Sequence, residues 1–148
     1  MTELLHANAL MVRGVGVLLL GPSGSGKSDF SLRLIDRGAQ LIADDYVVIE
    51  QRQGGLWASA APKIAGKMEI RHIGIVDVDH SAKGPLQAAV KLSTLPLDRL
   101  PEEQFFTHLE TKLPLITLNP FEVSATIKLE WFVKRLKGQL AGGDGKTL

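Results

Sequence analysis

The sequence predicts an α/β fold built on a phosphate-binding loop, with a β-rich mixed sheet core and few helices. Residues 21–28 read Gly-Pro-Ser-Gly-Ser-Gly-Lys-Ser, a complete match to G-x-x-x-x-G-K-[ST]. An apolar run, residues 15–20, leads into this loop, and a helix-like segment, residues 28–37, follows it. Most other segments resemble short strands, whereas a doubly wound sheet would alternate strands and helices more regularly. We therefore expect a partly antiparallel sheet around a central strand, loop and helix.

The predicted strands are short apolar runs bounded by turn residues. A turn at Arg13-Gly14 separates the first two, and Gln53-Gly-Gly55 predicts a hairpin. The first helix should end at Gly38, a residue typical of a C-cap. The strands are expected at residues 4–11, 15–20, 40–43, 46–49, 56–60, 68–70, 73–78 and 86–95. Lys83-Gly-Pro85 should break the chain, and residues 101–107 should form a short helical turn.

The last long element is predicted to be a helix capped by Asn119. Pro120 suits its first turn, Glu122 stands three residues after the cap, and Gly138 can end it. Alternating apolar residues over 123–131 favour a strand instead, but the capping residues favour the helix. Apolar residues recur at helical spacing, namely Phe121, Ala125, Leu129, Phe132 and Leu136. We expect one domain over residues 1–140 and a flexible tail over 141–148.

The composition excludes several classes of protein. The 148 residues are 45% hydrophobic and 22% charged, as in a globular domain. The net charge of +1 gives no reason to expect nucleic acid or an acidic membrane as a partner. The absence of cysteine excludes disulfides and thiolate metal sites, and it is compatible with a cytoplasmic location. The apolar run at 14–20 is too short to span a bilayer.

The loop predicts a nucleotide site. Its glycines allow successive backbone N–H groups to face an anion, and the following helix adds its positive N-terminal end. Lys27 would contact the β- and γ-phosphates of ATP, and the Ser28 hydroxyl would bind Mg²⁺. The expected nucleotide-binding residues are Gly21, Pro22, Ser23, Gly24, Ser25, Gly26, Lys27 and Ser28.

Carboxylates that follow apolar strands are the candidates for holding the metal or accepting a proton. One pair, Asp44-Asp45, begins 16 residues after Ser28; another carboxylate, Asp77, follows residues 73–76. Two adjacent aspartates would face the same site only if the strand ends before them. His6, a single histidine in a strand-like segment, is by itself more typical of a packed or surface residue.

These segments, taken in order, resemble the catalytic domain of the bacterial HPr kinase/phosphorylase family. The resemblance extends from about His6 to Gly138. Its most specific parts are the Ala-Asp-Asp that ends at Asp45 and the stretch Glu-Ile-Arg…Gly-Ile-Val-Asp over residues 69–77. Arg37-Gly38, Ala61-Pro62 and Asp98-Arg-Leu100 also stand in family order. The resemblance implies a fold like that of HPr kinase and phosphoenolpyruvate carboxykinase.

The resemblance also implies an activity and residue roles. The enzyme would use ATP and Mg²⁺ to phosphorylate a serine of an HPr-like phosphocarrier, and inorganic phosphate to remove that phosphate. Asp44 matches the general base, assisted by His6, and Arg99 matches an arginine that stabilises phosphoryl charge. Ser28 and Glu69 match Mg²⁺ ligands. By the same analogy we expect a homo-hexamer.

The sequence departs from the family pattern at several places, among them a segment after Val78 that is shorter than usual. His72 stands where the family often has glycine. Residues 117–120, Thr-Leu-Asn-Pro, align with a Pro-Gly-Arg-Asn stretch that is associated with dephosphorylation in the family. The arginine of that stretch is missing here, which argues against a phosphorolysis activity. Full-length members carry a further N-terminal domain, and we expect either a short form that lacks it or a fragment of a longer chain.

Two other functions are compatible with a phosphate loop. A small-molecule kinase usually has an arginine-rich lid after the core, and the sequence has no such cluster. A nucleotide-sensing module would not need Asp44 and Glu69. A regulatory GTPase is disfavoured because no Asn-Lys-x-Asp segment is found.

Overall fold

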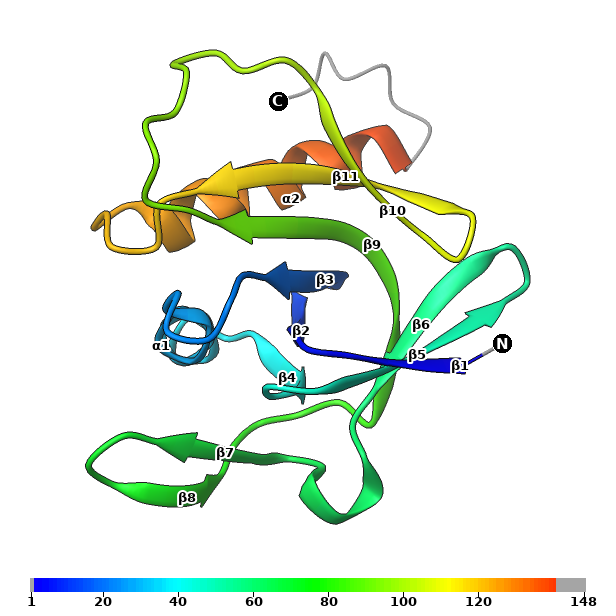
Figure 1. Cartoon of the computed structure of the whole chain (residues 1–148), viewed down its shortest axis with the longest axis vertical. Helices are drawn as coiled ribbons and strands as arrows, with labels where there is room; N and C mark the ends of the chain where they lie inside the picture. Colours follow the sequence, from blue (N-terminus) through cyan, green and yellow to red (C-terminus); the bar gives the residue numbers. More distant parts are fainter. Residues whose placement is uncertain (1, 141–148) are drawn as a thin grey trace.

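The computed structural model describes residues 2–140, which form a mixed, β-rich α/β fold with two α-helices (Figure 1). A nine-stranded sheet has the order β1-β5-β6-β9-β3-β2-β4, with β11 and then β10 added beside β9. A separate two-stranded hairpin, β7-β8, lies beside α1. The expected tail at 141–148 lies outside the described residues.

The elements have the following bounds. The strands are β1 (Thr2–Leu5), β2 (Asn8–Val12), β3 (Val15–Leu20), β4 (Gln40–Ala43), β5 (Val47–Arg52), β6 (Gly55–Ser59), β7 (Lys67–Ile70), β8 (Gly74–Asp77), β9 (Lys83–Leu92), β10 (Gln104–His108) and β11 (Thr111–Leu118). The helices are α1 (Lys27–Asp36), a 3₁₀ turn η1 (Pro62–Ile64) and α2 (Ala125–Leu140). Neither α-helix in residues 2–140 is long and apolar enough to cross a membrane.

Three parallel strands bring their carboxyl ends to one edge of the sheet. Strand β9 pairs in parallel with β3 on one side and with β11 on the other, and the three arrows point the same way in Figure 1. Strand β2 pairs antiparallel with both β3 and β4, so β4 also ends at this edge. The loops that follow β4, β3, β9 and β11 therefore lie along one side of the molecule, where ligands of such sheets usually bind.

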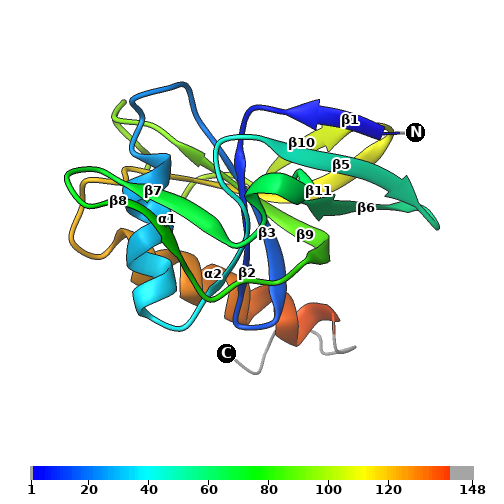
Figure 2. The same cartoon turned by 90° about the horizontal axis from the view of Figure 1, so that it is seen from below.

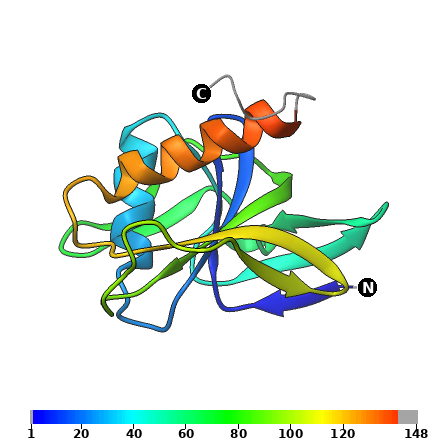
Figure 3. The same ribbon diagram turned by 90° about the horizontal axis from the view of Figure 1, so that it is seen from above.

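The sheet is buried on both faces in its centre. Residues at alternate positions of β3 belong to different clusters, with Val17 and Leu19 facing one and Leu18 the other. Both helices contribute side chains to the first cluster, and Figure 3 shows α2, in orange, running across that side of the sheet. The second cluster includes residues of strands β5, β6 and β11, which are seen on the side away from the helices in Figure 2. Burial on both faces explains why residues 15–20 read as an unbroken apolar run.

The strand predicted at residues 4–11 is two strands. The chain changes partners at His6-Ala7, so that β1 pairs with β5 while β2 pairs with β3 and β4. The predicted break at Lys83-Gly-Pro85 is wrong, because β9 begins at Lys83. Pro85 lies within β9, and its backbone comes so close to Gly16 that a Cβ added to Gly16 would stand 1.9 Å from the Pro85 carbonyl oxygen.

The segment from 101 to 118 differs most from the prediction. Instead of a helical turn, residues 104–108 form β10, which pairs antiparallel with β11. Leu109 and Glu110 connect the two strands with positive φ angles of 46° and 63°. Such angles suit a tight hairpin turn but are favoured by glycine or asparagine, and neither residue stands here, so no turn signal was present. Strand β11 was not predicted, and it contains Pro114, a residue that is rare inside sheets.

The final helix is confirmed but begins later than predicted. Asn119 accepts a hydrogen bond from the Phe121 N–H (3.0 Å), and this turn delays α2 until Ala125. Phe121 is 66% exposed and lies outside the buried face. Gly138 lies within the helix and does not end it. The buried face of α2 consists of Ala125, Leu129, Val133 and Leu136, with Phe132 packed against it.

Candidate active site

The phosphate-binding loop connects the carboxyl end of β3 to the start of α1, as the sequence predicts. Gly24 and Gly26 have φ angles of 81° and 96°, which L-residues with side chains rarely adopt. An added Cβ at Gly26 would also contact Pro120 and Phe121 at 3.5 and 3.6 Å. The two glycines therefore let the backbone turn tightly while the loop stays packed beneath the segment that follows β11.

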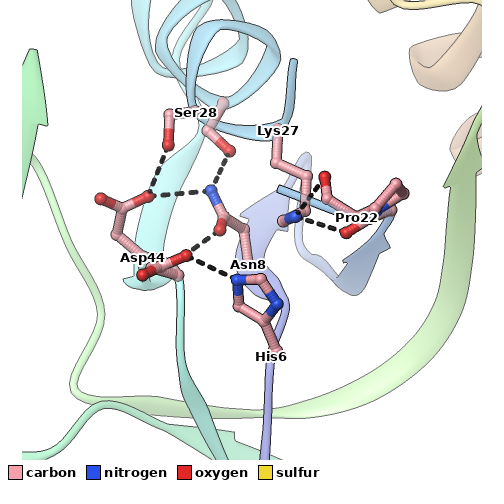
Figure 4. A network of polar contacts seen from close by, with 9 residues as sticks. His6, Asn8, Pro22, Lys27, Ser28 and Asp44 are labelled. Carbon is pink, nitrogen blue, oxygen red and sulfur yellow. Dashed lines mark hydrogen bonds and ion pairs between the residues drawn. The ribbon is translucent and has the colours of Figure 1, made fainter. Parts of the chain in front are cut away.

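Lys27 is buried under the loop. Its Nζ donates hydrogen bonds to the carbonyl oxygens of Gly21 and Pro22, the latter at 3.1 Å (Figure 4). Burial lowers the pKa of this ammonium, while the nearby Asp45 and Asp44 carboxylates act in the opposite direction. The ammonium is held inside the curve of the loop, where a phosphate bound by the loop would meet it.

Asp44 and Asp45 follow the last residue of β4 and both face the loop. The strand ends at Ala43, which is the condition under which adjacent aspartates share one site. Asp45 has a φ of 71°, and the Tyr46 N–H bonds to the Asp44 carbonyl over 2.8 Å. The result is a three-residue turn of a rare, strained kind, which persists where the surroundings hold it in place.

The side chain of Asn8 holds this turn in place, and the sequence analysis did not identify Asn8 as a site residue. The side chain is fully buried at the start of β2. Its Nδ2 donates to the Ser31 Oγ (2.8 Å) and to Asp44 Oδ1 (3.0 Å), while its Oδ1 accepts from the Asp45 N–H (2.8 Å). An asparagine two residues after His6, in an otherwise apolar strand, was the available signal, because a buried amide must find partners.

The environment of Asp44 suits a proton acceptor. Partial burial raises the pKa of its carboxyl, and the charge of Asp45 adds to this effect. Hydrogen bonds from the Ser28 hydroxyl (3.2 Å), from Asn8 and from the backbone of Glu69 counteract it by stabilising the ionised form. A carboxylate with a raised pKa binds a proton more readily at neutral pH than an ordinary aspartate does.

His6 contacts the second aspartate of the pair. Its Nε2 lies 2.8 Å from Asp45 Oδ1, and its ring packs against Tyr46 with 5.0 Å between the ring centroids. Among the hydrogen bonds and ion pairs of residues 2–140, none joins His6 to Asp44. Any help that His6 gives to Asp44 therefore passes through Asp45 and the turn.

The phosphate-binding loop and the two aspartates line one open cleft of about 690 Å³, which we call the acidic cleft. Its lining includes Lys27, Ser28, Asp44, Asp45 and Glu69. Met68 is buried in the core and anchors β7, so that Glu69 points into the cleft from the β7-β8 hairpin. Arg71 and His72 line the cleft from the same hairpin.

The acidic cleft offers oxygen ligands, as Mg²⁺ requires. The Ser28 hydroxyl and the Glu69 carboxylate, the two ligands expected from the sequence, both line it. Within residues 2–140, no three side chains of the His, Asp or Glu type gather closely enough to hold a metal unaided. The donor set therefore fits a Mg²⁺ that is completed by substrate phosphates and water rather than an all-protein metal site.

Two of the sequence candidates lie elsewhere. Asp77 accepts a hydrogen bond from Lys67 (2.8 Å), which lowers the pKa of its carboxyl, and it does not line the acidic cleft. Arg99 lies in the exposed loop between β9 and β10 and lines neither of the two clefts at this edge of the sheet. The structure thus brings together Lys27, Ser28, Asp44 and Glu69, but not Arg99.

Comparisons with known proteins point to one family. A family model described as the HPr serine kinase C-terminal domain matches residues 1–119. The HPr kinase/phosphorylase of Brevibacillus brevis is 45% identical over 78 residues, which cover 52% of this chain and 25% of that protein. The HPr kinase/phosphorylase of Chlorobium phaeobacteroides is 49% identical over 74 residues, 49% of this chain and 22% of that protein. The match spans about a quarter of the length of these relatives.

A solved structure shares the whole fold. The HPr(Ser) kinase/phosphatase from Coxiella burnetii superposes with a TM-score of 0.83 at 28% identity. The similarity covers 94% of this chain and 99% of that one. The mixed β-rich sheet with its two helices is therefore an architecture already observed in a protein of this type.

Proposed function

The chain belongs to the HPr serine kinase C-terminal domain family, and from this membership we propose that it is an ATP- and Mg²⁺-dependent protein-serine kinase. Its substrate is an HPr-like phosphocarrier protein of the phosphotransferase system. The catalytic domain is formed by residues 1–140. The single observation that carries the proposal is the placement of the Asp44 carboxylate beside the phosphate-binding loop, 3.2 Å from the Ser28 hydroxyl.

The chemistry follows from this placement. The acceptor serine of the carrier enters the acidic cleft, and its hydroxyl proton passes to the Asp44 carboxylate. A bond forms between the serine oxygen and the γ-phosphorus of ATP while the bond to the β–γ bridging oxygen breaks, which leaves ADP in the loop. Such transfer needs alignment and charge neutralisation more than covalent catalysis.

The residues of the loop and the cleft hold the reactants. The backbone N–H groups of residues 21–28 and the Lys27 ammonium bind the phosphates. Ser28 and Glu69 would hold Mg²⁺, which supplies neutralisation of the charge that develops on the phosphates. His6 supports the Asp44-Asp45 turn by its bond to Asp45. The proposed role of Arg99 in stabilising phosphoryl charge has family resemblance as its support.

Further properties belong to the same proposal. We expect a homo-hexamer in the cytoplasm, with no nucleic acid or membrane partner, in line with a net charge of +1. Removal of serine phosphate by inorganic phosphate should be weak or absent, because Thr117-Leu-Asn-Pro120 has no arginine. Light scattering of the purified chain tests the oligomeric state.

The decisive experiment is phosphate transfer with a mapped product. The chain is incubated with radiolabelled ATP, Mg²⁺ and HPr-like carriers, and the labelled residue is identified. We expect one labelled serine, and no label in a carrier whose serine is replaced by alanine. Label that appears only in a metabolite fraction would indicate a small-molecule kinase. ATP binding without transfer to any acceptor would indicate a nucleotide sensor and would refute the kinase proposal.

A further inference from the structure

A second cleft adjoins the phosphate-binding loop on the side away from Asp44. It has a volume of about 380 Å³ and lies at the carboxyl ends of three strands. Its lining comes from the loop after β3, from residues 91–95 at the end of β9, and from Phe121 after β11. We call it the strand-end cleft. None of the proposed catalytic or metal-binding side chains lines it.

The two clefts meet at the loop. Ser23, Gly24 and Phe121 line both of them, so one extended ligand can pass from one cleft to the other over the loop. The phosphates are fixed by the loop itself. The remainder of a nucleotide must therefore leave the loop toward one cleft or the other.

The chemistry of the lining differs sharply between the two sides. The acidic cleft contains four carboxylates, Asp29, Asp44, Asp45 and Glu69, and no aromatic group other than Phe121 and the His72 ring. The strand-end cleft contains no carboxylate. It offers hydroxyl groups from Ser93 and Thr94 together with the apolar side chains of Leu95 and Phe121.

Phe121 is well placed for contact with a flat ligand. Its side chain is 66% exposed although it packs over the loop, with its Cζ 3.6 Å from where a Cβ on Gly26 would stand. Leu95, which lines the same cleft, is 72% exposed. Exposed apolar groups that face a polar, concave surface are typical of ligand sites rather than of packing.

We propose that the strand-end cleft binds the nucleoside of the nucleotide, with Phe121 stacking on the base and Ser93 or Thr94 contacting the ribose. This inference rests on the proposed use of a nucleotide. It assigns the acidic cleft to the metal and the incoming serine, which need carboxylates, and the strand-end cleft to the base and sugar, which do not. The order along the sheet edge is acceptor beside β4, phosphates beside β3, and nucleoside beside β9 and β11.

The test compares ATP with tripolyphosphate, which carries the same phosphates and no nucleoside. Both ligands are titrated calorimetrically with Mg²⁺ into the full chain and into Phe121→Ala. Stacking of a base on an aromatic ring contributes about five- to a hundredfold to affinity. The substitution Phe121→Ala should therefore lower the affinity for ATP by that factor. The affinity for tripolyphosphate should change less than about twofold on the same scale. Val123→Ala, two residues away and 96% exposed, is the matched control and should change neither affinity.

A second measurement locates the nucleoside without any substitution. Backbone amide shifts are recorded with saturating ATP and with saturating tripolyphosphate. We expect the shifts that differ between the two ligands to fall on residues 91–95 and on Phe121.

The possible results distinguish a wrong nucleoside assignment from a wrong kinase proposal. Differential shifts at residues 69–72, or equal loss of both affinities in Phe121→Ala, would overturn the nucleoside assignment. Equal wild-type affinity for ATP and tripolyphosphate would also overturn it, while leaving the phosphate loop functional. Failure of both ligands to bind would refute the nucleotide-dependent function itself.

Discussion

The Nδ2 of Asn8 donates a hydrogen bond to Oδ1 of Asp44 over 3.0 Å, although 36 residues separate them in the chain. Through its Oδ1 the same amide holds the Asp45 N–H at 2.8 Å. Asn8 therefore fixes both the carboxylate and the strained backbone that carries it. We regard Asn8 as a positioning residue, because its side chain bonds to the two aspartates and to Ser31 and does not line the acidic cleft.

Asn8→Ala should lower kcat by about 10- to 100-fold, since misplacing a reacting group has effects of this size. The KM for ATP should change little, because Asn8 does not line the acidic cleft. The amide also lowers the pKa of Asp44, so its loss should raise that pKa further. We therefore expect the acid limb of the kcat profile to move to higher pH in steady-state assays.

Ser31→Ala is the matched control for this substitution. It removes the other side-chain partner of Asn8, a hydroxyl 2.8 Å away, and leaves the bond to Asp44 in place. Its kcat profile should keep the wild-type acid limb. An unchanged acid limb in Asn8→Ala, with kcat reduced, would mean that Asn8 contributes to folding alone.

Asp44→Asn should reduce phosphate transfer by about 10²- to 10⁴-fold, the usual contribution of a general base. ATP affinity should stay within about threefold, because no phosphate ligand is lost. Both quantities are measured on the same preparation by transfer assay and calorimetry. Asp77→Asn serves as the control, because Asp77 bonds to Lys67 outside the acidic cleft and its loss should leave transfer unaltered. If Asp44→Asn keeps its rate, Asp45 becomes the candidate base.

The parts of the site that are local in sequence could be predicted from the sequence. The loop from Gly21 to Ser28 carries its own geometry in its glycines, and the apolar run before it identified the central strand. The end of β4 at Ala43 could be foreseen as a condition for Asp44 and Asp45 to share a site. Each of these inferences needs only neighbouring residues.

The parts that depend on distant partners could not be predicted. Asn8 is an ordinary polar residue until β2 pairs with β4 and brings it to Asp45. Residues 104–118 form a hairpin whose turn residues, Leu109 and Glu110, lack turn signals, and their strand β11 exists because it pairs with β9. The late start of α2 depends on a turn at Asn119 that packs over the loop. Tertiary pairing decides such elements, and local propensity does not.

Lys27→Ala should abolish detectable phosphate transfer and lower the affinity for ATP by at least about tenfold. The reason is that the Lys27 ammonium is the side-chain charge held inside the loop. The affinity for tripolyphosphate should fall by a similar factor, since both ligands present the same phosphates. Calorimetric titration of the two ligands measures this. An unchanged affinity for both would place the phosphates outside the loop.

The raised pKa of Asp44 also predicts that Asp44→Asn is more stable than the wild type at neutral pH. An acid whose folded-state pKa lies above its ordinary value of 3.8 favours folding only while it is protonated. That contribution is complete below pH 3.8 and is lost as the pH rises through the folded-state pKa. Asparagine is never charged, so the variant avoids the cost of an ionised, partly buried carboxylate.

The midpoint of thermal unfolding should therefore be higher for Asp44→Asn than for the wild type at pH 7, and the gap should close as the pH falls toward 3.8. Scanning calorimetry of both proteins over this range measures the gap. Asp77→Asn should behave in the opposite way, because Lys67 lowers the pKa of Asp77 and its charge stabilises the fold at neutral pH. A less stable Asp44→Asn at pH 7 would mean that the hydrogen bonds from Ser28 and Asn8 outweigh burial. The carboxylate would then be held as a structural anion instead of being poised to take up a proton.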